Sequence, residues 1–171
     1  MEERGRKMSN SSLAEKFIKA THFSKGRSGR KIETITIHHM AGVLTCEQCG
    51  RIFQGNRQAS AHYGVGSDGR IAQYVDEADT AWSNSNWDSN CKSITIETSN
   101  SSVGGNWPIS DKVLNSLIRL VAANVSVGTT VASTGNNINF TEITYPAELA
   151  YFVSSPVKTS ENEIVSLPVV T

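Results

Sequence analysis

Apolar and polar residues alternate along several segments of the chain, a pattern that is typical of half-buried β-strands. The segments are residues 33–38, 61–66, 70–75 and 92–97. The first ends in a His-His pair, and the last contains Ile94 and Ile96 two positions apart. A Ser-Asp-Gly sequence separates the second and third segments, and a tight turn of this composition predicts a hairpin.

Two further segments have apolar residues at helical spacing. Thr45 has the chemistry of an N-cap, and the helix that follows it to about residue 53 would place Cys49, Ile52 and Phe53 on one face. Residues 111–123 follow a Ser-Asp cap and form the second predicted helix. Its apolar positions are Val113, Leu114, Leu117, Ile118 and Val121. Strands interleaved with helices predict an α/β fold with a mixed central β-sheet flanked by helices.

Composition divides the chain into three parts. Residues 1–30 are strongly basic and predict a flexible leader with one short helix over residues 13–20, capped by Ser11 or Ser12. Residues 31–123 contain the predicted domain. Residues 124–171 contain no His, Cys, Trp or Arg and lose the helical spacing, so we expect a β-prone or irregular C-terminal segment. Weak strands are expected there at residues 126–133, 138–144, 150–153 and 163–170.

The charge balance gives no reason to expect a nucleic-acid partner or insertion into a membrane. Sixteen basic and sixteen acidic residues cancel, so no net charge favours an anionic polymer. No apolar run is long enough to span a bilayer, and the N-terminus lacks the apolar core of a signal peptide. We therefore expect the protein to stay in the cytoplasm unless another factor releases it.

The three cysteines do not predict a disulfide framework, because their number is odd and a secretion signal is missing. Cys46 and Cys49 have the spacing of half a zinc knuckle, but no second pair follows them. Two free thiols on one helical turn are the simpler interpretation. A site that borrows His38 or His39 is the alternative.

The adjacent histidines of the first strand must point to opposite faces of the sheet. The even spacing from Ile35 and Ile37 predicts that His39 enters the apolar core and that His38 faces the other side. A rigid strand end that presents a neutral imidazole suits a metal ligand. Packing of one histidine and solvation of the other is the alternative interpretation.

Four motifs follow one another in a characteristic order. They are His-His-Met-Ala-Gly from His38, Ser-Ala-His-Tyr from Ser60 with its hairpin, a Trp/Asn-rich loop from Trp82, and Ile-Thr-Ile-Glu ending at Glu97. In this order they resemble the zinc-dependent N-acetylmuramoyl-L-alanine amidases, the family that includes phage lysins and peptidoglycan recognition proteins. The resemblance covers about residues 28–122 and implies the mixed α/β fold of that family.

The resemblance implies a reaction and roles for particular residues. The expected substrate is peptidoglycan, in which zinc-activated water hydrolyses the amide bond between N-acetylmuramic acid and L-alanine. His38 matches the family's first zinc ligand, and Glu97 matches its general base. Aromatic and amide side chains suit a rim that binds sugar and peptide groups. The expected rim residues are Trp82, Asn84, Asn86 and Tyr63. Tyr63 could instead be a core aromatic residue, and His62 could approach the metal or be exposed.

The sequence departs from the family where two further zinc ligands are expected. The family takes a second His and a Cys or Asp from its C-terminal third, but here no His follows His62 and no Cys follows Cys91. Either the C-terminal part has been replaced, so that the fold is incomplete, or other ligands are used. Three functions therefore stay open: an active amidase of phage or prophage type, an inactive cell-wall-binding remnant, and an interaction protein whose C-terminal segment pairs with another chain.

Overall fold

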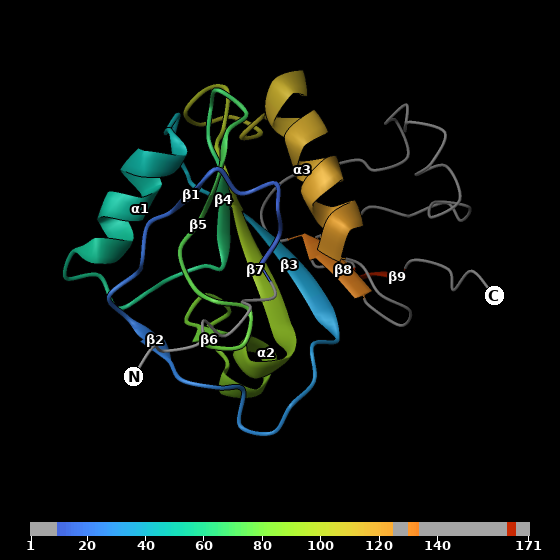
Figure 1. Ribbon diagram of the computed structural model, residues 1–171. Coiled ribbons are helices and arrows are strands. Elements are labelled where there is room, and N and C mark those ends of the chain that lie inside the picture. The colour runs from blue at the N-terminus through green and yellow to red at the C-terminus, as the bar shows by residue number, and fades with distance from the viewer. Residues whose placement is uncertain (1–9, 125–129, 134–163, 167–171) are drawn as a thin grey trace.

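The computed structural model describes residues 10–124, 130–133 and 164–166. Within these residues, a mixed seven-stranded sheet has the strand order β1-β5-β4-β7-β3-β8-β9 (Figure 1). Its strands are β1 (Lys16–Phe17), β3 (Thr34–His39), β4 (Tyr63–Val65), β5 (Ile71–Gln73), β7 (Ser93–Thr98), β8 (Thr130–Ser133) and β9 (Ile164–Ser166). A separate antiparallel pair joins β2 (Phe23–Ser24) to β6 (Thr80–Ala81).

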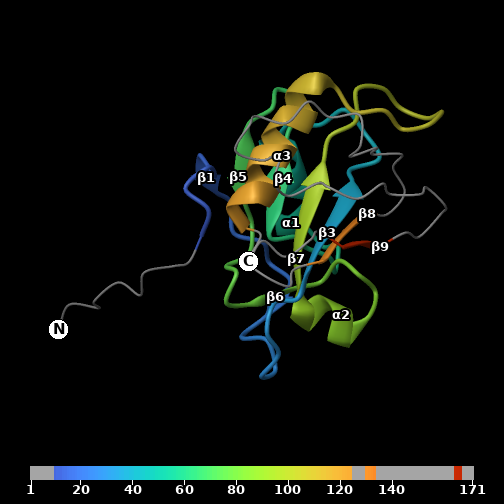
Figure 2. The ribbon, with the colours of Figure 1, turned by 90° about the vertical axis from the view of Figure 1, so that its right-hand side faces the viewer.

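Two helices cover opposite faces of the sheet, as Figures 1 and 2 show. Helix α1 (Cys46–Gln54) packs on one face, and α3 (Asp111–Asn124) packs on the other. A short third helix, α2 (Trp87–Lys92), lies at one end of the sheet and was not predicted. The predicted α/β class with a mixed sheet between helices is confirmed.

Parallel pairing of β3 with β7 forms the centre of the apolar core. Ile35 is the register partner of Ile94, and Ile37 is the partner of Ile96. These four side chains are at most 3% exposed and pack beneath apolar residues of α3 such as Leu117. The alternation read from the sequence is therefore confirmed for both strands, and the predicted hairpin is the antiparallel pair β4–β5.

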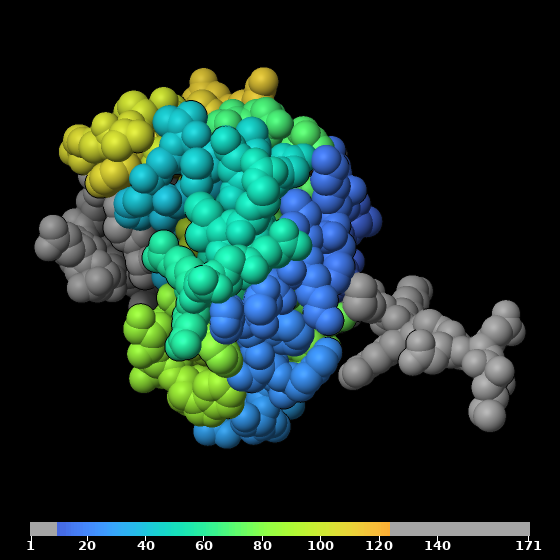
Figure 3. Space-filling model, turned by 90° about the vertical axis from the view of Figure 1, so that its left-hand side faces the viewer, coloured from blue at the N-terminus to red at the C-terminus, as the bar shows by residue number. Residues whose placement is uncertain are grey.

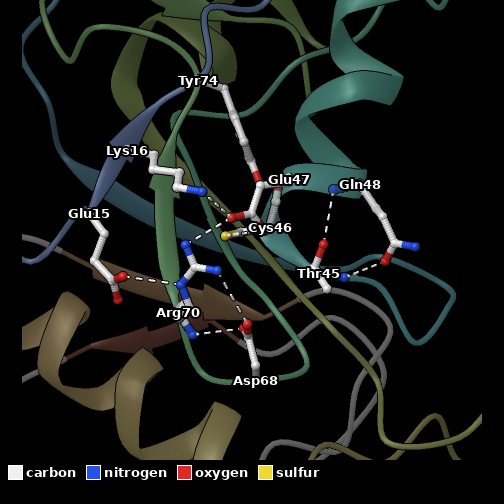
Figure 4. Close-up of polar contacts among 9 residues, drawn as sticks. All are labelled: Glu15, Lys16, Thr45, Cys46, Glu47, Gln48, Asp68, Arg70 and Tyr74. Carbon is white, nitrogen blue, oxygen red and sulfur yellow. Dashed lines mark hydrogen bonds and ion pairs between the residues drawn. The ribbon is translucent and has the colours of Figure 1, made fainter.

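Helix α1 begins at a capping box that Figure 4 shows. The Thr45 hydroxyl accepts from the Gln48 backbone N–H at 3.2 Å, and the Gln48 side-chain oxygen accepts from the Thr45 N–H at 2.7 Å. These two bonds satisfy backbone donors that a helix start leaves unpaired. Of the three residues predicted to share one face of this helix, Cys49 and Phe53 are buried and Ile52 is exposed.

The N-terminal segment is part of the domain, and the predicted helix over residues 13–20 is wrong. Backbone N–H groups of Glu15, Ile18 and Ala20 donate to carbonyls of the β5 segment at 2.8–2.9 Å. An open strand edge offers such partners, whereas an isolated short helix gains few bonds for the entropy it loses. Ion pairs join Lys16 to Glu47 at 2.7 Å and Glu47 to Arg70 at 2.9 Å, next to this strand (Figure 4).

Arg27 anchors the end of the N-terminal segment inside the protein. Its guanidinium donates to the carbonyls of Glu77, Cys91 and Ser93 at 2.6–3.0 Å and lies 2.9 Å from Nε2 of His62. Burial lowers the pKa of Arg27, and the Glu77 carboxylate opposes that shift. A buried charge that donates to several carbonyls fixes the segment firmly.

Two of the predicted weak strands contain observed ones. Residues 126–133 include β8, which pairs parallel with β3, and residues 163–170 include β9, which pairs antiparallel with β8. The predicted strands at 138–144 and 150–153 lie outside the described residues. Among the residues that are described, no helix is both long and apolar enough to cross a membrane.

We expect Arg27→Met to destabilise the protein by about 3–5 kcal/mol, because three carbonyls would lose a charged, buried donor. Urea unfolding followed by circular dichroism measures the change. Arg30→Met is the matched control, since Arg30 forms an exposed ion pair with Asp88 at 2.9 Å and should cost about 1 kcal/mol or less. Equal stabilities of the two variants would contradict the anchoring role.

Candidate functional site

The β3–β7 register places His38 beside Glu97, although 58 residues lie between them in the chain. Partners in adjacent parallel strands project to the same side of the sheet. This side faces α1, opposite the isoleucine core. On the other flank of β7, the register partner of Glu97 is Gly64, where any Cβ would clash with the Tyr74 ring. The carboxylate therefore has no side chain from β4 beside it.

A cavity of about 390 Å³ lies over Glu97, between α1 with its following loop and the segment after β6. Figure 3 faces this side of the molecule, with α1 in teal and residues 82–90 in yellow-green. The α1 residues of the lining are Cys49, Ile52 and Phe53, and the segment after β6 adds polar side chains such as Ser83 and Asn90. The lining includes Met40, Leu44, Ile52, Phe53, Ala59, Trp82, Ser60, Ser83, Asn90, His39 and Arg57. Such a mixed cavity suits a ligand with apolar and amide groups.

Glu97 is largely enclosed, and this burial raises its pKa to about 7. The positive charge of Arg57 opposes the shift. Arg57 is the one Lys or Arg among the described residues of the lining. A carboxyl group with a pKa near the working pH can both accept and return a proton, which is what general acid–base catalysis needs.

His38 is held by the amide of Asn84. Its Nε2 lies 2.9 Å from the Asn84 carbonyl oxygen, which accepts the ring N–H. The Asn84 amide nitrogen donates in turn to Ser89 at 3.0 Å and Ser93 at 3.1 Å. Burial lowers the pKa of His38, so the ring is neutral at pH 7. Asn84 thus orients an imidazole, a role that differs from the rim position predicted for it.

A zinc site is not complete within the described part of the chain. No group of three or more His, Cys, Asp or Glu residues in that part could hold a metal ion. Burial raises the pKa of both the Cys46 and Cys49 thiols to about 12, so neither is a ready thiolate ligand. His38 alone fits the expected donor set, and one imidazole does not fix a zinc ion.

The other predicted rim residues have different environments. Trp82 lines the cavity, and its indole N–H donates to the Ser24 hydroxyl at 2.9 Å. Asn86 is the N-cap of α2 and accepts from the Ser89 N–H at 2.9 Å. Tyr63 is fully buried in the core beneath α3, where its hydroxyl donates to Glu77. The prediction that Tyr63 lies at the rim is therefore wrong.

His62 is a structural residue rather than an exposed one. The side chain is completely buried between Arg27 and Thr95, and its Nδ1 lies 3.1 Å from the Thr95 hydroxyl. Burial, assisted by the Arg27 charge, lowers the pKa of His62 to about 3. Its ring nitrogens are engaged inside the protein, so the alternative that His62 binds a metal is not supported.

His39 lines the cavity, and the prediction that it enters the apolar core is wrong. Its ring packs against Trp107 with the centroids 5.2 Å apart. The physical reason is that His39 is the last residue of β3 and lies beyond the buried apolar cluster beneath α3. Arg57 of the lining was not predicted from the sequence, because a loop residue gives no periodic signal.

Comparisons with known proteins agree with this architecture. The structure of an AmpD derivative, 18% identical in sequence, matches with a TM-score of 0.53 over 66% of this chain and 73% of that one. Drosophila peptidoglycan recognition protein SA, 16% identical, matches with a TM-score of 0.50 over 67% and 72% of the two chains. These likenesses show the fold. No curated protein sequence matches the chain.

The family comparison is more specific. The family model described as N-acetylmuramoyl-L-alanine amidase matches residues 28–138, which is more than half of the chain. The match contains β3, the hairpin, β7 and α3, and therefore both His38 and Glu97. The chain belongs to the N-acetylmuramoyl-L-alanine amidase family of hydrolases.

Proposed function

We propose that this protein is a peptidoglycan amidase of the phage or prophage lysin type. It would hydrolyse the amide bond between N-acetylmuramic acid and L-alanine in the bacterial cell wall, and it would reach the wall after release from the cytoplasm. The observation that supports this best is the enclosed Glu97 carboxylate at the cavity, with His38 as its register partner on the next strand.

Glu97 would act as the general base and then as the general acid. Its carboxylate takes a proton from a water molecule whose oxygen attacks the amide carbonyl carbon. When the C–N bond breaks, the same group returns the proton to the leaving nitrogen of L-alanine. The raised pKa of Glu97, about 7, suits both transfers near neutral pH.

Zinc supplies the water activation in this family, and His38 is the residue that the resemblance assigns to the metal. The neutral ring oriented by Asn84 fits that assignment. The remaining described residues do not complete the site. The chemistry that the described residues supply is therefore the pair of proton transfers at Glu97.

The cavity lining suits a muramyl peptide. The half-buried indole of Trp82 offers a flat face to a sugar ring, and the apolar side with Leu44 and Phe53 suits the small L-alanine side chain. Amide and hydroxyl groups of Asn90 and Ser83 could pair with the polar atoms of the substrate.

Glu97→Gln should lower amidase turnover by about 100- to 10,000-fold, because the shape is kept and the proton acceptor is lost. Release of L-alanyl peptide from purified peptidoglycan, in buffer containing zinc, measures turnover. Sedimentation with peptidoglycan should show wall binding close to wild type. Glu33→Gln, an exposed residue outside the cavity, is the control. Wild-type lysis by Glu97→Gln would rule out the role.

The same variant should be more stable than the wild type at pH 8. The folded-state pKa of Glu97, about 7, exceeds the ordinary value of 4.5. The stability that this group contributes is therefore present below pH 4.5 and lost as the pH rises to about 7. The difference between these two pKa values corresponds to about 3 kcal/mol. Urea unfolding of the variant and the wild type at pH 8 and at pH 4.5 measures the difference in stability between the two proteins. The same difference at both pH values would contradict this expectation.

We expect the isolated protein to hold zinc weakly after dialysis, because one imidazole leaves the ion mostly hydrated. Metal analysis should give well under one zinc per chain, with His38→Ala indistinguishable from the wild type. One tightly held zinc in the wild type that is lost in His38→Ala would contradict this expectation and show that further ligands exist in the chain.

A further inference from the structure

His39 has an unsatisfied ring nitrogen in the wall of the cavity. Its Nδ1 is buried and has no hydrogen-bond partner. The Ser83 hydroxyl, which belongs to the same lining, is likewise buried without a partner. Buried polar atoms in native proteins are nearly always paired, so each exception calls for an explanation. Since the unpaired Nδ1 of His39 is enclosed, it limits which ring nitrogen can carry the proton.

The environment of the His39 ring determines which nitrogen faces a ligand. Nδ1 is enclosed, whereas Nε2 is not among the enclosed unpaired atoms and makes no hydrogen bond with any of the described residues. An orphaned buried N–H is rarer than an orphaned acceptor. The proton therefore resides on Nε2, and His39 offers an N–H donor toward the cavity.

Trp107 holds this donor in place. Its indole lies against the His39 ring at an interplanar angle of 45°. The backbone of Trp107 has a φ of 49°, a conformation that a bulky residue seldom adopts without support. That support comes from the fully buried Asn100, whose amide donates to the Trp107 carbonyl at 2.8 Å.

Asn100 also connects this support to the strand end. Its side-chain oxygen accepts from the Gly42 N–H at 3.2 Å, and its own backbone N–H donates to the Gly42 carbonyl at 3.0 Å. The loop that contains Trp107 is thereby joined to the chain three residues after His39. A strained residue held by a buried amide indicates that the position of the His39 ring matters.

We propose that His39 is a substrate-binding residue that donates its Nε2–H to an acyl oxygen of the muramyl peptide, and that Trp107 is its positioning residue. The inference rests on the proposed function and extends it to a residue outside the expected site. An acyl oxygen is the matching acceptor because the substrate is built from amides, whose carbonyl oxygens accept strongly. The contact is made in the bound ground state, so it contributes to affinity.

His39→Phe keeps a ring against Trp107 and removes the donor, whereas His39→Gln restores a side-chain N–H near the position of Nε2. Loss of one hydrogen bond to a neutral acceptor should weaken binding about three- to ten-fold. We expect His39→Phe to raise KM and the calorimetric Kd for a soluble muramyl tripeptide by this factor with kcat nearly unchanged. His39→Gln should recover most of the loss, and Trp107→Leu should raise KM in the same way.

His22→Phe is the matched control. His22 is also half-buried, packs against a tryptophan (Trp82, centroids 6.0 Å apart) and has a buried unpaired Nδ1, but it lies outside the cavity lining. It should bind the tripeptide like the wild type. Thermal unfolding midpoints within a few degrees of each other would show that all variants are folded.

The outcomes separate this inference from the proposed function. A wild-type Kd in the His39→Phe variant, or equal losses in His39→Phe and His39→Gln, would overturn the role of His39 while the amidase proposal stands. A wild-type protein that neither binds nor hydrolyses the tripeptide would overturn both.

Discussion

The parallel pairing of β3 with β7 is the constraint on which the rest of the structure depends. Six consecutive register pairs join two segments that are far apart in the chain, from Thr34 with Ser93 to His39 with Thr98. One face of this pair supplies the isoleucine core beneath α3, and the other supplies His38 and Glu97. A slip of one residue would exchange the two faces, so the core that fixes the register also fixes the geometry of the site.

Burial of Glu97 lowers the stability of the folded protein where the carboxylate is ionised. The ionised carboxylate is disfavoured in its enclosed position, and its pKa rises to about 7 as a consequence. Gly64 beside it keeps β4 free of a side chain, and the Tyr74 ring uses that space. The surrounding protein holds a group that would be more stable in water. Such a local loss of stability is consistent with the proton-transfer role proposed for Glu97.

The N-terminal segment completes the domain although the family match begins only at residue 28. Its strand β1 extends the sheet along β5, and Arg27 joins three separate backbone carbonyls to the His62 ring. Trp82 of the cavity donates to Ser24 of the same segment. The segment before the matched region therefore supports one wall of the cavity and protects an open sheet edge.

The sequence by itself determined the strands β3, β4, β5 and β7, the two longer helices and the family. Alternation through Ile35 and Ile37, and again through Ile94 and Ile96, is a local pattern, because side chains on a strand repeat every two residues. The Thr45 cap is local for the same kind of reason: its partners lie three residues away. The resemblance of the motifs to the family already placed Glu97 and His38 in one region of the fold.

Only the tertiary structure decided which residues face the cavity. His39 has the alternation of a core residue, but it is the last residue of β3 and its ring packs against Trp107. Tyr63 has the aromatic side chain expected of a residue at the rim, yet its strand is central and its ring is buried. Residues 13–20 have the capping and spacing of a short helix, but they lie beside the edge of the sheet, where β1 pairs with β5. In each case the deciding contact joins residues distant in the chain, and a local pattern does not contain that information.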